Sequence, residues 1–429
     1  MRTAFDILVL GAGPAGIAAA VTAAENGRSV GLVDDNPAPG GQIWRAGGPM
    51  PQAARAWIGR LENSAVERVQ GWRAFDFPGP HTVRAERTGS AEHADLRFEK
   101  LILATGARER FLPFPGWTLP NVMGAGGLDA MVRGGLPIEG KRVVVAGTGP
   151  LLLAVAAHLA HQGARILEIC EQAPAAQMLP LAAQVARQPG KLRQGAQYRW
   201  ATRYSPYRTN CRPLSAHGDS RLRSVALRQG AKQWVVECDY LACGFHLLPN
   251  TELAELLGCR LEDGFVATDE LLQTSVENVA CAGEPTGIGG VELSLLEGRI
   301  AALAACGRQQ EARPLIPERS RSMSFVRALR HACALAPQLR EIAAGDTIVC
   351  RCEDVPLSAL RGYAGWRDAK LHTRCGMGPC QGRICGGAVE FLFGWRAESV
   401  RPPLFPALVG SLAGSVAEPN ISDHLKETV

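Results

Sequence analysis

The chain opens with an apolar run, a glycine-rich turn and a second apolar stretch. Residues 6–10 have the apolar pattern of a buried strand. The turn Gly11-Ala12-Gly13-Pro14-Ala15-Gly16 follows, and the alanine-rich residues 17–24 favour a helix. A strand, a glycine-rich turn and a helix in this order predict a phosphate cradle, where the N–H groups of the helix N-terminus face an anion.

The turn has the spacing G-x-G-x-x-G, and each glycine has an expected role. Gly11 allows the tight turn, Gly13 lets the backbone approach a pyrophosphate, and Gly16 lets the helix pack closely on the strand. The next apolar run, residues 29–33, ends in Asp34-Asp35, which can accept hydrogen bonds from a ribose. An ordinary surface turn could share the glycine spacing, but the flanking strand, helix and acids favour a dinucleotide site.

Three later segments fit the same bound ligand. Gly41, Gln42 and Arg45 lie in a Pro/Gly loop that can press against a planar group, although an ordinary loop has the same composition. The apolar run 100–104 ends in Thr105-Gly106, as expected of a strand that returns to the sheet beside the ligand. Another strand, 277–282, ends in Gly283-Glu284, and a carboxylate there can accept a hydrogen bond from a ribityl or ribose hydroxyl.

The opening pattern occurs a second time from Lys141 onward. A strand over 142–146, the turn Gly147-Thr148-Gly149-Pro150-Leu151-Leu152 and a helix to residue 162 predict a second dinucleotide fold. Leu152 takes the place of the third glycine, so we expect the helix to be pushed outward and the pyrophosphate space to be narrowed. The second unit is therefore expected either to bind a nicotinamide nucleotide or to be an empty structural module.

Composition describes a globular protein of several domains. The chain has 429 residues, of which 46% are hydrophobic and 20% charged, with a formal net charge of +5. The charge is spread along the sequence, so no nucleic-acid partner is expected. No apolar run is long enough for a membrane span. With a strand starting at once and no signal sequence expected, we predict a cytoplasmic location, with attachment at the inner membrane face as a variant.

The chain has 13 cysteines, and five of them crowd into one C-terminal stretch. Such clustering indicates a metal site, and thiolates favour an iron–sulfur cluster or zinc. No C-x-x-C or C-x₄-C pair lies in the segments expected beside the flavin, which argues against disulfide reduction. The clustered residues are Cys350, Cys352, Cys375, Cys380 and Cys385.

These motifs together resemble one family. G-A-G-P-A-G, D-D-N-P-A-P-G-G-Q-I-W-R, L-A-T-G-A and C-A-G-E resemble the flavoprotein fold of thioredoxin-reductase-like and ferredoxin-reductase-like enzymes. C-R-C followed by G-M-G-P-C-Q-G-R-I-C resembles the bacterioferritin-associated-ferredoxin-like (BFD-like) [2Fe–2S] module. The combination resembles the alpha subunits of heteromeric dye-linked amino-acid dehydrogenases, a family that includes opine oxidase, hydroxyproline and proline dehydrogenase and hydrogen cyanide synthase subunits.

The resemblance implies an α/β fold with two Rossmann-like domains and a small BFD-like domain. FAD would bind in a discontinuous domain of residues 1–120 and 241–310, and residues 121–240 would form the second Rossmann-like domain. A helical linker, 311–345, would lead to the [2Fe–2S] domain, 346–400, and a tail, 401–429.

The resemblance also implies roles for individual residues. The [2Fe–2S] cluster would be held by Cys350, Cys352, Cys380 and Cys385, with Cys375 as a neighbouring free thiol. Cys375 could instead replace Cys380 or Cys385, and a zinc knuckle is the alternative site. The residues expected to contact FAD are Gly11, Gly13, Pro14, Ala15, Gly16, Asp34, Asp35, Gly41, Gln42, Arg45, Thr105, Gly106, Gly283 and Glu284.

The function implied is that of an electron-transfer subunit without catalytic residues of its own. A beta subunit resembling D-amino-acid oxidase would oxidise the C–N bond of an amino acid or opine. Electrons would pass through flavin, including an FMN at the subunit interface, and then through [2Fe–2S] to a quinone or other carrier. A small ferredoxin-like gamma subunit is a further expected partner. The alternatives are a self-contained NAD(P)H-dependent reductase and a non-catalytic nucleotide-bound scaffold.

Overall fold

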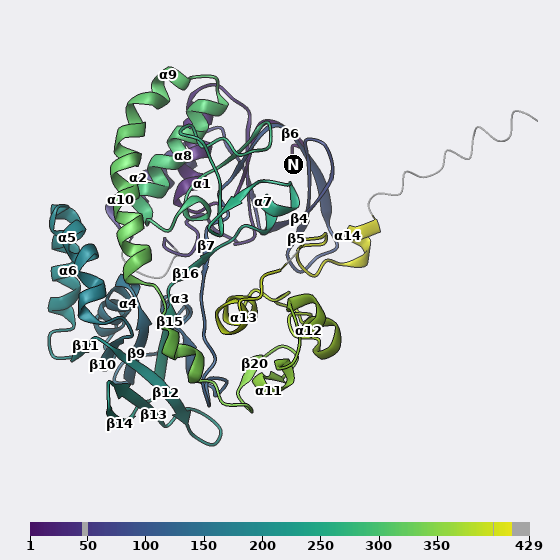
Figure 1. Ribbon diagram of the computed structural model, residues 1–429. Coiled ribbons are helices and arrows are strands. Elements are labelled where there is room, and N and C mark those ends of the chain that lie inside the picture. Colours follow the sequence, from purple (N-terminus) through teal and green to yellow (C-terminus); the bar gives the residue numbers. More distant parts are fainter. Residues whose placement is uncertain (45–49, 398, 414–429) are drawn as a thin grey trace, which may run out of the picture.

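A computed structural model describes residues 1–44, 50–397 and 399–413. Two α/β domains lie one above the other, and a small C-terminal module packs beside both (Figure 1). Arg45, expected to contact the cofactor, lies outside the described residues, as do residues 414–429 of the expected tail.

The first domain is built on a sheet that, within the described residues, contains seven strands. Its order is β3-β2-β1-β6-β5-β4, and β19 pairs with β6. β3, β2, β1, β6 and β19 run parallel, whereas β4 and β5 add an antiparallel extension. The strands are β1 (Ala4–Leu10), β2 (Val30–Asp34), β3 (Glu67–Gln70), β4 (Trp72–Gly79), β5 (Thr82–Arg87), β6 (His93–Leu103) and β19 (Val279–Cys281).

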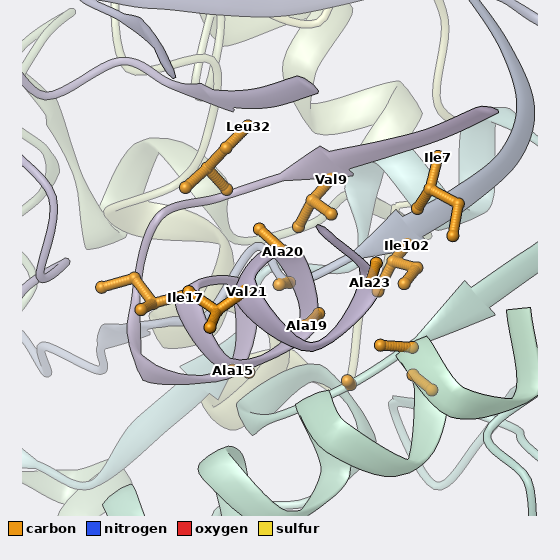
Figure 2. Packing of buried hydrophobic residues seen from close by; sticks show 14 of the residues in the cluster. Ile7, Val9, Ala15, Ile17, Ala19, Ala20, Val21, Ala23, Leu32 and Ile102 are labelled. Atoms are coloured by element: carbon orange, nitrogen blue, oxygen red, sulfur yellow. The ribbon is translucent and has the colours of Figure 1, made fainter. Parts of the chain in front are cut away.

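Small residues let two helices cover one face of this sheet closely. Figure 2 shows Ile7, Val9 and Ile102 of the strands facing alanines of α1 (Pro14–Glu25). α8 (Val291–Ala305) packs against α1, and a Cβ at Gly298 would lie 2.1 Å from the carbonyl oxygen of Ala15. Also present are α2 (Gln52–Glu62), α7 (Glu252–Leu256), α9 (Gln309–Ala312) and the short strands β17 (Leu261–Glu262) and β18 (Phe265–Val266).

The second domain has a parallel sheet of order β11-β10-β9-β15-β8 and an antiparallel sheet, β12-β13-β14. β15 pairs with β9 throughout its length, so the second domain reaches Phe245 and the expected return to the first domain at residue 241 is too early. Its strands are β8 (Val122–Gly124), β9 (Arg142–Thr148), β10 (Arg165–Glu171), β11 (Tyr207–Arg208), β12 (Cys211–His217), β13 (Ser224–Gln229), β14 (Lys232–Glu237) and β15 (Tyr240–Phe245). Its helices are α3 (Ala125–Arg133), α4 (Pro150–His161), α5 (Ala175–Ala186) and α6 (Pro189–Ala201).

The two domains are joined by β7 (Ala107–Glu109), which pairs antiparallel with β16 (Leu247–Pro249). α10 (Ile316–Ala332) then packs on both α8 and α5, so the expected linker helix contacts both domains (Figure 1). The C-terminal module contains β20 (Ile348–Cys350), β21 (Val355–Pro356), α11 (Leu357–Leu360), α12 (Trp366–Thr373), α13 (Cys385–Phe393) and, farther on, α14 (Val409–Ala413).

Within the described parts of the chain, no helix combines the length and apolarity needed to cross a membrane.

Candidate functional site: two glycine-rich turns and a cysteine group

The first glycine-rich turn is held tightly by its own backbone. A Cβ at Gly16 would lie 1.7 Å from the carbonyl oxygen of Gly11, and a Cβ at Gly11 would lie 2.2 Å from that of Ala104. Gly11 also has a φ of 106°, which only glycine adopts without strain. Gly11 therefore lies at a tight turn, and Gly16 lies where the helix packs closely on the turn.

Gly13 differs from Gly11 and Gly16 because no contact with the described residues requires a glycine there. A Cβ at Gly13 would meet no atom of the described residues within 4 Å, and its φ of −75° is open to any residue. Gly13 is the N-cap of α1, and no side chain of the described residues caps this helix end. The turn thus presents open space and free N–H groups at a helix N-terminus, which together suit a pyrophosphate.

The loop after β2 closes over this turn. The N–H of Gly40 donates to the carbonyl of Ala12 (2.7 Å), and a Cβ at Gly41 would lie 2.9 Å from the Cα of Gly13. Gly41 therefore lies beside the turn. The adjacent Gln42 is exposed.

The two acids after β2 have different environments. Asp34 is 8% exposed and accepts hydrogen bonds from the N–H groups of Ala12 (2.5 Å) and Asn36 (2.8 Å). Asn36 Nδ2 also donates to Oδ1 (2.8 Å), so Oδ2 is the oxygen that can accept a further bond, such as one from a ribose hydroxyl. Asp35 is more exposed and forms an ion pair with Arg73 (3.2 Å).

Thr105 and Gly106 are held by a residue that the sequence did not single out. Thr105 Oγ1 donates a hydrogen bond to the backbone carbonyl of Asn250 (2.6 Å). In return, Asn250 Nδ2 donates to the backbone carbonyl of Thr105 (2.9 Å). The N–H of Asn250 donates to the carbonyl of Gly106 (3.0 Å). The loop at the end of β6 is therefore fixed to the start of α7.

Glu284 has an acceptor oxygen without a partner among the described residues. Its Oε1 accepts the N–H of Gly290 (3.0 Å), whereas its Oε2 is out of contact with solvent and has no hydrogen-bond partner among the described residues. Burial of the carboxyl raises the pKa of Glu284 to about 7. Pro14 and Ala15 begin α1 at this point, and a Cβ at Gly283 would lie 2.8 Å from that of Ala15.

These observations fit FAD. The open turn at Gly13 suits a pyrophosphate, and a buried acceptor without a partner, Glu284 Oε2, suits a hydroxyl donor. The buried Glu297 accepts bonds from the Gly283 N–H (2.8 Å) and from Arg319 (2.8 Å). Glu297 thus holds the loop at Gly283 in place through hydrogen bonds. Its position inside the alanine-rich helix α8 did not indicate this role in the sequence.

The second glycine-rich turn is covered by the chain itself. A Cβ at Gly149 would lie 2.8 Å from Cys333 Sγ, just after α10. Gln172 Nε2 donates to Thr148 Oγ1 (3.3 Å) and to the carbonyl of Ala334 (3.1 Å). Leu152 is 1% exposed and belongs to the hydrophobic core of this domain. The obstruction over the turn is therefore Cys333 and the residues after it.

The acid of the second unit is fully enclosed. Glu171 is 0% exposed, and its carboxylate accepts bonds from Thr148 Oγ1 (2.6 Å), the Gly149 N–H (2.6 Å) and the Ala173 N–H (2.9 Å). Burial raises the pKa of Glu171, and these hydrogen bonds oppose that rise. Glu171 therefore stabilises the turn from inside the protein.

The C-terminal cysteines gather in two sets. The Sγ atoms of the buried Cys350, Cys375 and Cys385 lie within 4.8 Å of one another. The exposed Cys352 and the half-buried Cys380 form a thiol–thiol contact with each other. Cys375 was expected to be a free thiol beside the cluster. Its sulfur is instead as close to those of Cys350 and Cys385 as a shared metal site requires. The Gly376 N–H also donates to Cys350 Sγ (3.4 Å).

A cavity of about 430 Å³ opens between the cysteine module and the second domain. Glu109 lies in its wall and accepts the N–H groups of Gly126 (2.7 Å) and Gly127 (3.1 Å) at the start of α3. Burial raises the pKa of Glu109. The wall also contains Phe111, Trp117, Met123, Cys350, Cys352, Cys380 and Cys385.

Comparison with known proteins agrees with this architecture. Residues 5–309 match the family described as Pyridine nucleotide-disulphide oxidoreductase. The A subunit of opine oxidase from Rhizobium meliloti (strain 1021) is 32% identical over 96% of this chain and 99% of its own. Hydrogen cyanide synthase subunit HcnB of Pseudomonas aeruginosa is 28% identical over 89% of this chain and 90% of its own. The fold is similar to L-proline dehydrogenase from P. horikoshii, with a TM-score of 0.64 and 19% identity, over 96% of this chain and 80% of that one.

Proposed function

The chain belongs to the pyridine nucleotide-disulphide oxidoreductase family, and we propose that it is the electron-transfer subunit of a heteromeric dehydrogenase. The main supporting observation is that, among the described residues, the first glycine-rich turn is open, whereas Cys333 lies against the second. The cysteine module also packs on the strands that join the two domains. A Cβ at Gly387 in α13, the helix that begins at Cys385, would lie 2.4 Å from the side chain of Leu248 in β16.

The first domain would bind FAD. The N-terminus of α1 would hold the pyrophosphate, Asp34 the adenosine ribose, and Glu284 Oε2 a ribityl hydroxyl. Bound flavin accepts two electrons and releases them singly, as a one-electron cluster requires. The N-terminus of α8, next to Glu284, would stabilise negative charge near the flavin ring.

The C-terminal module would hold [2Fe–2S]. The five thiols fit such a cluster, which needs four thiolates, and the Gly376 N–H can hydrogen-bond to a ligating sulfur. We propose Cys350, Cys352 and Cys380 as three of the ligands. The family resemblance implies Cys385 as the fourth. The geometry allows Cys375 in that place equally, because both sulfurs lie within 4.8 Å of Cys350 Sγ.

Substrate oxidation would occur in a partner. The relatives are named as subunits, which supports an assembly with a beta chain resembling D-amino-acid oxidase, and a small ferredoxin-like gamma chain extends the proposal. The substrate would be an amino acid or opine oxidised at its C–N bond. The cavity beside the cysteines has aromatic walls and is the candidate position for FMN at the interface. A cytoplasmic location stays a prediction, and attachment at the inner membrane face has no support in the fold.

The NAD(P)H reductase alternative has less support. Nicotinamide nucleotide would have to displace Cys333 from Gly149 and break the bonds that Gln172 makes to Thr148 and Ala334. Glu171, the acid at the end of the following strand, is already enclosed.

Purification from the native source tests the assignment. We expect a yellow-brown complex with flavin absorbance, a reduced-cluster EPR signal and a second chain identified by mass spectrometry. A lone chain whose flavin bleaches rapidly with anaerobic NADH would contradict the relay. A chain without flavin absorbance would instead indicate the scaffold.

Paired serine variants test the fourth ligand. If Cys385 ligates, C385S loses the EPR signal and bound iron while C375S keeps both, and the opposite result would assign Cys375. C170S is the control, because the buried Cys170 belongs to the core of the second domain. Zinc in place of iron, measured by elemental analysis of anaerobically purified protein, would contradict the cluster.

A further inference from the structure

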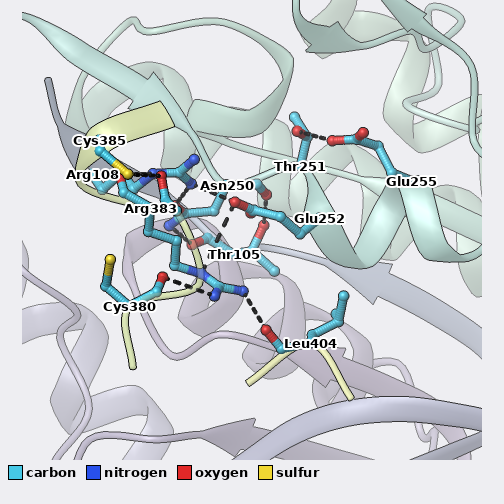
Figure 3. Close-up of polar contacts among 11 residues, drawn as sticks. Thr105, Arg108, Asn250, Thr251, Glu252, Glu255, Cys380, Arg383, Cys385 and Leu404 are labelled. Atoms are coloured by element: carbon cyan, nitrogen blue, oxygen red, sulfur yellow. Dashed lines mark hydrogen bonds and ion pairs between the residues drawn. The ribbon is translucent and has the colours of Figure 1, made fainter. Parts of the chain in front are cut away.

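A polar chain connects the cysteine loop to the flavin-side loop of the first domain (Figure 3). Arg383 lies in the loop between Cys380 and Cys385, and Arg108 lies in β7, directly after Thr105-Gly106. Arg108 Nε donates to the carbonyl of Arg383 (3.2 Å). Both loops were expected to be redox sites, but no motif indicated that they touch.

One carboxylate is shared between the two arginines. Glu252, at the start of α7, forms an ion pair with Arg108 (2.8 Å) and a longer one with Arg383 (4.0 Å). All three side chains are mostly buried, with exposed fractions of 27% for Arg108, 22% for Glu252 and 17% for Arg383. An ion pair shielded in this way is weakened by solvent less than a surface pair, and removing one partner leaves a charge uncompensated.

Each end of the chain is tied to backbone. Arg108 Nη1 donates to Asn250 Oδ1 (2.8 Å), and Asn250 in turn is bonded to Thr105. At the other end, Arg383 donates to the carbonyls of Cys380 (3.4 Å) and Leu404 (3.0 Å). The guanidinium of Arg383 also lies 3.9 Å from the centroid of the Phe405 ring.

We propose that Arg108, Glu252 and Arg383 are positioning residues that fix the cysteine loop against the flavin-side loop and set the reduction potential of the group bound by that loop. The proposal rests on the proposed function for the redox group, but the contact itself is a property of the chain. A cation beside the cysteine loop stabilises the more negative, reduced state of a cluster. Two arginines on one carboxylate leave a net positive charge there.

The docking role is tested by hydrogen exchange on the full chain, with and without cofactors. E252Q removes the shared anion, and we expect exchange in the peptides that contain Arg108 and Arg383 to rise at least about tenfold. R396Q is the matched control, because Arg396 forms an exposed ion pair with Glu390 on α13 of the same module. Equal exchange in E252Q and R396Q would overturn the bridge.

The electrostatic role is tested by an EPR-monitored redox titration. R383Q should shift the reduction equilibrium of the cluster about tenfold toward the oxidised form, or about 59 mV for a one-electron couple. R383K keeps the charge and should recover most of this shift while losing the carbonyl contacts. An R383Q potential equal to that of R396Q would overturn this role. Absence of an EPR signal in the unmodified protein would overturn the proposed function, while the exchange result would still decide the bridge.

Discussion

The two glycine-rich turns share a sequence pattern and differ in what covers them. At the first turn, a Cβ at Gly13 would meet no described atom within 4 Å. At the second, a Cβ at Gly149 would meet Cys333 Sγ at 2.8 Å. Each turn binds the acid of the following strand, but Asp34 keeps some exposure while Glu171 has none. A dinucleotide motif therefore predicts the local backbone, and distant residues decide whether a ligand has room.

The largest effect is expected from Gly13→Val. The valine side chain would enter the open space at the turn, so FAD should bind at least about 100-fold more weakly, a loss of about 2.7 kcal/mol. The thermal stability of the apo-protein should change little, because no described protein atom is in the way. Flavin fluorescence titration and thermal unfolding measure the two quantities. A variant with full flavin content would contradict an open pyrophosphate site.

The second effect concerns pH and Glu284. Burial raises its pKa to about 7 from an ordinary value of 4.5, so the native state keeps a proton that the unfolded chain loses between these values. The stability of the apo-protein should therefore fall as pH rises across this range, by no more than about 3 kcal/mol. Denaturant unfolding at several pH values measures the slope. E284Q is the comparison, and an equal slope in both proteins would show that Glu284 does not carry it.

A smaller effect is expected from Gly149→Ala at the covered turn. Gly149 has a φ of 96°, and the new Cβ would press on Cys333, so unfolding should become easier by about 2 kcal/mol. Flavin content should be unchanged, unlike in Gly13→Val. Gly140→Ala is the control for backbone strain alone, because Gly140 has a φ of 70° and no described atom within 4 Å of its Cβ. Equal losses in both variants would mean that Cys333 exerts no pressure.

Local patterns predicted most of the fold. The apolar runs and glycine turns located β1, α1, β9 and α4, because strand and helix periodicity and turn chemistry are local properties. The expected domain boundary between residues 240 and 241 falls within β15, which pairs with β9, and a short buried strand carries no signal of which sheet it joins. The pairing of β15 with β9 joins segments about a hundred residues apart, so local patterns cannot predict it.

The residues of the two turns and the cysteine group were predicted less completely, because many of their contacts are also long-range. Gly11, Gly13 and Gly16 could be assigned roles from spacing alone. Asn250 and Cys333 could not, because each acts on a turn more than a hundred residues away in the sequence. The cysteine group was located by clustering, but the fold decides which sulfurs meet, and it brings Cys375 into the buried set.

The smallest effect is expected from Cys333→Ala, which tests whether one side chain closes the second turn. Removing the buried sulfur should cost about 1 kcal/mol of stability. NADH should still neither bind nor bleach the flavin, because Gln172 keeps the backbone at Ala334 in place and Glu171 stays enclosed. Anaerobic mixing with NADH and NADPH, followed by dithionite as the positive control, measures this directly. Flavin reduction by NADH in C333A alone would mean that the two turns differ by a single thiol, and the second would then be a latent nucleotide site.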